Sequence, residues 1–259
     1  MISKLFLLSG NDLPLTDRVY VRHPTVDDVL TLNQGFLCEE LYWTYVSSIL
    51  SDPYDYMVWL ADQGIDYETY SDFDVFLLRW NEANISDSIL QKDKSSANMM
   101  RDAMNFFFGK RNFSFVKVEG RKFFIDVDDP EWFIDENAFN IACEFIATVN
   151  CLEKTDRIKP ATPGHKKILI QDMREEQKRK AKSKTPQKPV THIADALATV
   201  LSGGSGAITP TNYNSTHIYQ LLSSSRAVQK KMVVQSLLNG IYTGMIKGDK
   251  IADNELRWV

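Results

Sequence analysis

The chain has 259 residues, of which 44% are hydrophobic and 25% charged, which is an ordinary globular composition with room for one large domain or two small ones. Its formal net charge of −4 by itself indicates neither nucleic-acid nor membrane binding. The three cysteines are Cys38, Cys143 and Cys151, and they include no C-x-x-C pair. Their number and spacing argue against a disulfide framework or a zinc site and favour a protein of a reducing compartment.

Targeting and membrane segments are not indicated. The apolar run near the N-terminus has only four residues, too few for the hydrophobic region of a signal peptide. The sequence contains no apolar run of 18 residues, the length needed for a membrane span. We therefore expect a cytosolic protein with no membrane partner.

The first fifty residues predict a short strand followed by helices. Alternation over residues 18–21 is typical of a strand, which Pro24 ends because it lacks an N–H for pairing. Thr25 and Asp28 have the spacing of a capping box and predict a helix start at Thr25. An aromatic-rich helix is expected over residues 39–50.

Two further helices are expected before residue 81. Asp52 and Pro53 suit the cap and the first position of a helix that runs to Asp62 and stops at Gly64. The next helix begins at Asp72. Residues 81–96 are polar and predict a loop or a weak helix.

Apolar residues recur at helical spacing between Met99 and Phe108. Such a methionine- and phenylalanine-rich face is either an adaptable partner-binding surface or one side of a buried helix. We favour the buried helix, and keep the alternative as a hypothesis for four residues: Met99, Met104, Phe107 and Phe108.

A β-hairpin is predicted over residues 113–127, with Gly120 supplying the positive φ of the turn. The acidic residues that follow, from Asp126 to Glu131, lack the spacing of a calcium loop, and turns or helix starts explain them better than a metal site. Asp135 is expected to cap a helix that packs on the hairpin. The fold class is thus α+β and predominantly helical.

Charge divides the chain into three parts. Residues 157–188 hold 11 Lys and Arg against three acids, a charge of +8, so the remainder carries −12. We predict an acidic α+β domain at 1–155, a basic linker at 156–190 with a short helix from Gly164 to about Lys180, and a helical module at 191–259. The linker is either a solvated spacer, which we favour, or a nucleic-acid arm with this basic patch: Lys178, Arg179, Lys180, Lys182 and Lys184.

The C-terminal part predicts a helix at 191–202, a glycine-rich connector at 203–206, and two helices separated at Ser223–Ser225. The connector lacks the lysine of a phosphate-binding loop. Val234 and Leu238 lie on the inner face of the last helix, whose pattern ends at Gly240.

No pattern of catalytic or metal-binding residues is present. The four histidines are scattered, and neither a nucleophile elbow nor a zinc-protease motif occurs. We therefore predict no enzyme, no cofactor and no metal.

The two ends of the sequence resemble a family of tail-gene proteins from tailed phages and prophages of Gram-positive hosts, similar in gene position to tail assembly chaperones. At the N-terminal end the resemblance rests on Val21, Pro24, Thr25, Val26, Asp28, Val29, Tyr42, Tyr45, Pro53, Tyr54, Gly64, Ile65, Asp66, Tyr67, Asp72, Phe73 and Phe76. At the C-terminal end it rests on Ser225, Gln229, Lys230, Leu238, Gly240, Ile241, Tyr242, Gly244, Ile246, Leu256 and Trp258.

The resemblance implies a non-catalytic role in phage tail morphogenesis. Such a protein binds the helical tape measure protein, or tail tube subunits, in the host cytoplasm, with apolar helical surface as the contact. A structural component of the virion tail or baseplate, nucleic-acid binding through residues 157–188, and a homo-oligomer are the alternatives. The implied partner-binding residues, besides those of the methionine-rich face, are Val234, Leu238, Tyr242 and Trp258.

Overall fold

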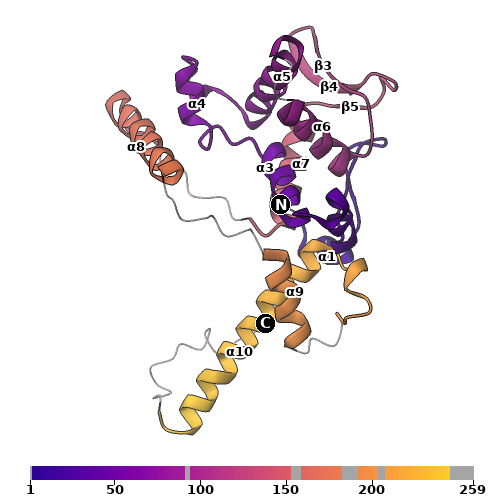
Figure 1. Cartoon of the computed structure of the whole chain (residues 1–259), viewed down its shortest axis with the longest axis vertical. Coiled ribbons are helices and arrows are strands. Elements are labelled where there is room, and N and C mark those ends of the chain that lie inside the picture. Colours follow the sequence, from indigo (N-terminus) through magenta and orange to yellow (C-terminus); the bar gives the residue numbers. More distant parts are fainter. Residues whose placement is uncertain (1, 91–93, 153–158, 183–191, 204–207, 246–259) are drawn as a thin grey trace.

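A computed structural model describes residues 2–90, 94–152, 159–182, 192–203 and 208–245. The described part is predominantly helical with small antiparallel sheets, which confirms the predicted α+β class (Figure 1). The α-helices are α1 (Lys4–Ser9), α2 (Val26–Leu30), α3 (Cys38–Ile49), α4 (Met57–Asp62), α5 (Asp72–Leu90), α6 (Lys94–Phe108), α7 (Glu136–Val149), α8 (Pro163–Lys182), α9 (His192–Ser202) and α10 (Ile218–Tyr242). The strands are β1 (Leu13–Pro14), β2 (Tyr20–Val21), β3 (Phe113–Val118), β4 (Arg121–Asp126) and β5 (Phe133–Ile134), and the 3-10 helices are η1 (Leu32–Gly35), η2 (Tyr67–Thr69) and η3 (Tyr213–Ser215).

Local capping fixes where α2 and α7 begin. The side chain of Thr25 accepts the N–H of Asp28, and the carboxylate of Asp28 accepts the N–H of Thr25 at 2.8 Å, so the predicted capping box is confirmed. At the start of α7, the carboxylate of Asp135 accepts the N–H of Ala138 at 2.8 Å. Both caps satisfy N–H groups that a helix start otherwise leaves unpaired.

The predicted hairpin is confirmed as β3 and β4, with Glu119 and Gly120 at the turn and Phe113 opposite Asp126. Strand β5 adds a short third strand to the sheet. Phe124, on the inner face, contacts the ring of Trp80 on α5 at a centroid distance of 4.7 Å. The helix directly beneath the hairpin is therefore α5, with α7 packed beside it through Phe76 and Phe139.

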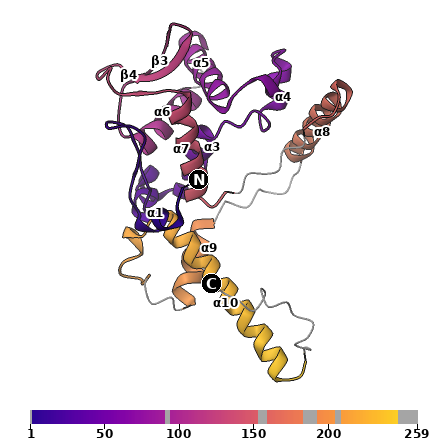
Figure 2. The ribbon, with the colours of Figure 1, turned by 180° about the vertical axis from the view of Figure 1, so that it is seen from behind.

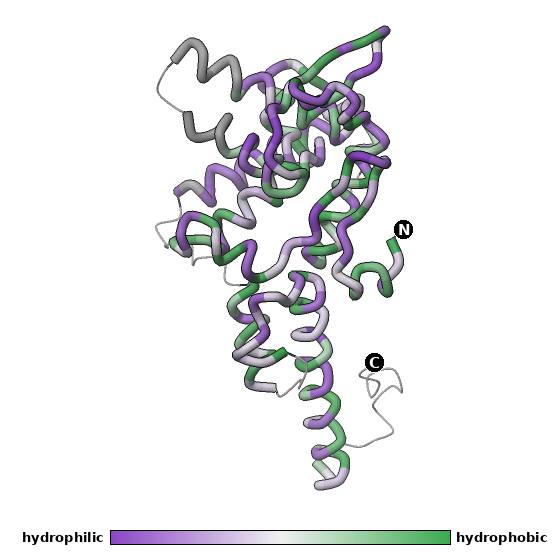
Figure 3. Tube along the Cα trace, turned by 90° about the vertical axis from the view of Figure 1, so that its right-hand side faces the viewer, coloured by the Kyte–Doolittle hydropathy of each residue, from purple (hydrophilic) through white to green (hydrophobic). Residues whose placement is uncertain are grey.

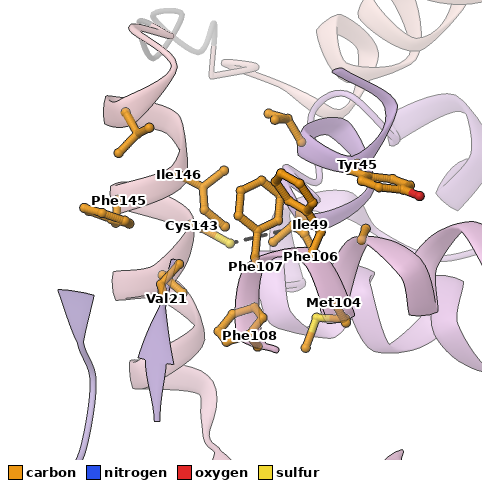
Figure 4. Close-up of a cluster of buried hydrophobic side chains, with 14 of the residues drawn as sticks. Val21, Tyr45, Ile49, Met104, Phe106, Phe107, Phe108, Cys143, Phe145 and Ile146 are labelled. Carbon is orange, nitrogen blue, oxygen red and sulfur yellow. Dashed lines mark hydrogen bonds between the residues drawn. The ribbon is translucent and has the colours of Figure 1, made fainter. Parts of the chain in front are cut away.

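The main hydrophobic core lies between α3, α6 and α7 (Figure 4). Phe107 projects from α6 toward Ile49 of α3 and Ile146 of α7, and all three are buried. Tyr42 on α3 donates a hydrogen bond of 2.7 Å to the buried side chain of Asn150, just beyond α7. A polar bridge of this kind fixes the relative positions of two core helices.

Three expected boundaries differ from the structure. The helix expected from Pro53 begins at Met57, because Asp52 accepts the N–H of Tyr54 and closes a turn before the helix starts. Helix α5 continues to Leu90 through residues expected to form a loop or a weak helix. The serines at 223–225 do not interrupt α10, which is one helix, because Ser225 is buried and α10 packs against α9, so that tertiary packing overrides weak propensity.

A smaller hydrophobic cluster lies at the side of the molecule, around α4. Its buried residues include Leu60, Tyr67 and Val75, and the half-buried Ile170 and Met173 of α8 pack against it. Both ribbon views place α8 beside α4, at the edge of the molecule (Figures 1 and 2). The helix expected from Gly164 to about Lys180 is thus present as α8.

The C-terminal helices are attached to the N-terminal part by specific contacts. The carboxylate of Glu39 on α3 accepts the first N–H groups of α9, from Ile193 at 2.5 Å and Ala194 at 3.2 Å. Buried residues of α9 and α10, such as Val200 and Leu221, belong to the same cluster as the N-terminal core. The division into domains stays a prediction. In the structure, the hydrophobic core is continuous between the described parts of the predicted N-terminal domain and of the predicted C-terminal module.

Candidate functional site

The methionine- and phenylalanine-rich face of α6 points into the core. Met104, Phe107 and Phe108 are buried, and Met99 is half-buried at the start of this face. Figure 4 shows Phe107 and Phe108 between α7 and α3. The burial supports the buried-helix interpretation, because a partner cannot reach these three side chains without opening the core.

The last third of α10 differs from the rest of the helix, because it leaves the body. In Figures 1 and 2 this part extends beyond α9, and Figure 3 shows hydrophobic residues alternating with hydrophilic ones along it. Of the residues predicted from sequence, Val234 is buried, Leu238 is half-buried and Tyr242 is 83% exposed. Trp258 lies outside the described residues.

Three exposed apolar residues in the second half of α10 and just beyond it are not among the residues predicted from the sequence. Met232 is 50% exposed, Val233 is 58% exposed and Met245 is 85% exposed. The pattern was interpreted as one buried face, and apolar residues do occupy about half of the circumference of the helix after residue 231, opposite the polar Gln235, Asn239 and Thr243. The exposed Val233 and Tyr242 lie at the two edges of this apolar half, and Met232 lies outside it. We call Met232, Val233, Tyr242 and Met245 the α10 apolar tip.

All the charged residues of this helix are positive. Residues 218–245 include Arg226, Lys230 and Lys231 and contain no aspartate or glutamate. Arg226 donates a hydrogen bond to the carbonyl oxygen of Cys151 and so ties the middle of the helix to the end of α7. The surface around the α10 apolar tip therefore combines apolar side chains with positive charge.

The basic patch lies at the C-terminal end of α8. Lys178, Arg179, Lys180 and Lys182 are exposed, and Lys180 forms an ion pair of 2.7 Å with Glu176 on the same helix. Lys184 lies outside the described residues. Nearer its start, α8 is held to the acidic α4–η2 surface by ion pairs of Lys166 with Asp66 and Glu68 and of Arg174 with Asp62.

The acidic residues after the hairpin are engaged in the fold. Asp126 forms an ion pair of 3.0 Å with Arg111 and accepts backbone N–H groups, and these interactions hold the pKa of its carboxyl below the usual value against the opposing effect of burial. Asp129 and Glu131 pair with Arg18. Among the residues that the structure describes, no group of three or more His, Cys, Asp or Glu side chains could hold a metal ion.

An open pocket of about 580 Å³ lies between the turn of the hairpin and the start of α7. Two of its carboxylates serve the fold: Asp74 forms an ion pair with Lys122 and accepts the N–H of Ser71, and Asp135 caps α7. Its other lining residues include no histidine, cysteine or serine. The pocket therefore offers no nucleophile with an adjacent base.

Two histidines from opposite ends of the chain meet beneath α10. The rings of His23 and His217 lie 4.7 Å apart, and the ring of His23 also contacts Phe145. Both ring nitrogens of His23 are buried and have no hydrogen-bond partner within 3.5 Å among the residues that the structure describes. Burial, with a smaller effect from His217 and an opposing one from Asp12, lowers the pKa of His23 to about 4. This residue is therefore a neutral packing group at neutral pH.

No helix in the described part of the chain is long and apolar enough to span a membrane. Comparison with protein-family models, with curated proteins and with solved structures finds no match for the chain.

Proposed function

We propose that this chain is a non-catalytic tail morphogenesis protein that binds an apolar helical segment of the tape measure protein in the host cytoplasm and keeps that segment soluble during assembly. The observation that carries the proposal is the α10 apolar tip, which leaves Met232, Val233, Tyr242 and Met245 open to solvent along the second half of a projecting helix and just beyond its end. The resemblance of the sequence ends supplies the biological setting.

The energy of the proposed contact follows from burial. Covering one such side chain with apolar protein stabilises a complex by about 1.5–3 kcal/mol before the costs of association. A few large residues carry most of the affinity of a hot spot, and Met232 and Tyr242 are of that kind. Val233 and Tyr242 are nine residues apart and therefore point to opposite sides of the helix, so the partner segment must wrap around the α10 apolar tip rather than lie along one side of it.

Charge narrows the choice of partner segment. Because residues 218–245 are basic and contain no acid, two copies of α10 would bring like charges together. We therefore expect a segment that alternates apolar residues with aspartate or glutamate. This expectation distinguishes a tape measure contact from pairing of two copies of this chain.

The proposal is tested with the purified full chain and a purified tape measure protein of a tailed phage from a Gram-positive host. The triple variant Met232→Ser, Val233→Thr, Tyr242→Ser removes the apolar side chains while leaving the charges of α10 unchanged. The control, Leu5→Ser, Phe36→Ser, Leu37→Ser, removes three strongly exposed apolar residues from α1 and the segment before α3. We expect affinity to fall at least 30-fold in the first variant and less than threefold in the control. Equal affinity in both variants would overturn the assignment of the surface.

The alternative of a structural virion component makes a different prediction. A protein that acts only during assembly is absent from purified particles, whereas a tail or baseplate component is present at a fixed copy number. Quantitative mass spectrometry of purified virions separates the two. Finding this chain at stoichiometric copy number would replace the assembly role with the structural one.

A further inference from the structure

Helix α8 carries a line of basic residues that the proposed function does not use. Lys167, Arg174, Lys178 and Lys182 follow one another at intervals of seven, four and four residues, which places them on one side of a helix. With a rise of 1.5 Å per residue, the line is roughly 22 Å long. All three lysines are exposed. We call Lys167, Lys178 and Lys182, together with the neighbouring exposed Arg179, the α8 basic stripe.

The α4–η2 surface determines which side of α8 faces solvent. Lys166 forms ion pairs with Asp66 and Glu68, and its ammonium group lies 4.6 Å from the centre of the Tyr67 ring. Two turns further along, Arg174 forms an ion pair with Asp62. Ile170 and Met173, between these two points, pack on the cluster around α4. The helix is thus held along two turns.

This attachment leaves the α8 basic stripe turned outward. Lys166, Ile170 and Met173, which contact α4 and η2, lie about 60–120° around the helix from Lys167, given 3.6 residues per turn. Arg174 lies on the line itself and forms its inner edge, where it pairs with Asp62. Figures 1 and 2 place α8 at the edge of the molecule in its upper half, well separated along the long axis from the projecting end of α10 in the lower half. The two surfaces can therefore be occupied independently.

We propose that the α8 basic stripe binds the phosphate backbone of nucleic acid without sequence preference. Lys178 and Lys182 are one turn apart, roughly 6 Å along the helix, so their ammonium groups can contact successive phosphates. The stripe has ammonium groups and one guanidinium group, which bind phosphates well. Because phosphate contacts carry no sequence information, we expect DNA duplexes of different base sequence to bind with equal affinity.

Two other classes of partner fit this surface less well. A membrane-surface helix needs a free apolar face, and the apolar residues Ile170 and Met173 are already packed against α4. A protein interface usually has apolar or aromatic anchors at its centre, which the line from Lys167 to Lys182 lacks. Interfaces with nucleic acid are instead polar and strongly positive, as the stripe is.

The overall charge of the protein makes the expected binding local and salt-dependent. The chain carries a net charge of −4, so the acidic body repels a polyanion, while the stripe places four exposed cations along one helix and attracts it. Neutralising about four phosphates of duplex DNA predicts a slope of about −3.6 in the logarithm of affinity against that of salt concentration. Affinity should thus fall about 100-fold between 50 and 200 mM salt.

The test uses the full chain and a fluorescently labelled 30-base-pair DNA duplex of arbitrary sequence at about 50 mM salt, a condition under which phosphate contacts are strong. The variant Lys167→Gln, Lys178→Gln, Lys182→Gln removes three charges from the stripe. The matched control, Lys110→Gln, Lys117→Gln, Arg121→Gln, removes three exposed charges near the hairpin. Unchanged circular dichroism and unfolding midpoints establish that both variants are folded.

We expect the wild-type chain to bind two unrelated duplexes equally, the stripe variant to bind at least 30-fold more weakly, and the control to stay within threefold. The α10 tip variant should bind DNA like the wild type, which separates this proposal from the tape measure contact. No binding by the wild type, or equal losses in both lysine variants, would overturn the proposal. Binding to vesicles containing phosphatidylserine without binding to DNA would also overturn it, in favour of a lipid surface.

Discussion

The Nδ1 nitrogen of His217 lies 2.8 Å from the carbonyl oxygen of His23 and donates a hydrogen bond to it, although 194 positions separate the two residues. Two backbone hydrogen bonds of 2.9 Å flank this contact, from Ile218 to Pro24 and from Val26 to Thr216. Together they fix the first turn of α10 to the N-terminal segment. The projecting end of α10 is therefore held by the folded body, and its orientation follows from this junction.

A methyl group at Gly10 should disturb the same junction. Gly10 has φ +75° and a Cβ there would lie 2.3 Å from the His217 ring, while Gly64 has φ +73° and nothing within 4 Å. Gly64→Ala should cost only the backbone strain, about 1 kcal/mol. Gly10→Ala should cost about 2–4 kcal/mol because a clash is added. Urea unfolding measures both, and equal losses would show that His217 moves aside without cost.

Stability should fall when the solution is acidified from about pH 6.5 to about pH 4, because His23 binds its proton in the unfolded chain before it does so in the folded one. The full pKa difference corresponds to about 3 kcal/mol, which relaxation of the site should reduce to about 2. The pKa values of Asp28 and Asp126 lie below the usual carboxyl value, so the stability that their charged forms contribute is lost at still lower pH.

His23→Leu supplies the control for this pH dependence. It removes the titrating ring while keeping an apolar side chain against Phe145. We expect its free energy of unfolding, measured in urea at several pH values, to change much less between pH 6.5 and 4 than that of the wild type. The same loss in both proteins would mean that other groups cause it.

Two tyrosines should respond in opposite ways to loss of the hydroxyl. Tyr42→Phe leaves the buried carbonyl oxygen of Asn150 without its donor and should cost about 1–3 kcal/mol. The hydroxyl of Tyr67 is buried with no hydrogen-bond partner among the described residues, so Tyr67→Phe should be neutral or stabilising. Thermal unfolding of the two variants gives the comparison. A larger loss for Tyr67→Phe would contradict this account of the two hydroxyl groups.

The attachment of α8 to α4 should weaken with salt, since several of its ion pairs are partly exposed. Raising the salt concentration from about 0.05 to 1 M should speed amide exchange in α8 severalfold and leave exchange in α7 nearly unchanged. Arg174→Gln should produce part of this change already at low salt. Exchange in α8 that is independent of salt would indicate that Ile170 and Met173 alone hold the helix.

The predictions made from the sequence succeeded where the determining contacts are local. Thr25 and Asp28 lie three positions apart and bond to each other, and the hairpin turn at Gly120 depends on one residue with positive φ. The serines at 223–225 were misinterpreted as a break because their neighbours on α9 are distant in sequence. The contact between His23 and His217 has no local pattern at all.

Whether a candidate site could be predicted likewise depended on whether its signal is visible in the local sequence. The exposed basic patch on α8 was predicted because charge is visible in composition, and exposed charge is the usual state of lysine. The exposed residues Met232, Val233 and Met245 were missed, because an apolar residue is expected to be buried unless the structure shows otherwise. Which side of an apolar helix is covered depends on where that helix leaves the body.

The central claim is that the α10 apolar tip covers a hydrophobic segment of the tape measure protein. The most direct measurement is the soluble fraction of the tape measure protein when it is expressed together with the full chain or with the variant Met232→Ser, Val233→Thr, Tyr242→Ser. The account predicts that the wild-type chain keeps most of the partner soluble and copurifies with it, and that the variant leaves it in the pellet. A tape measure protein that is equally soluble with the variant, or that needs neither chain, would contradict the claim.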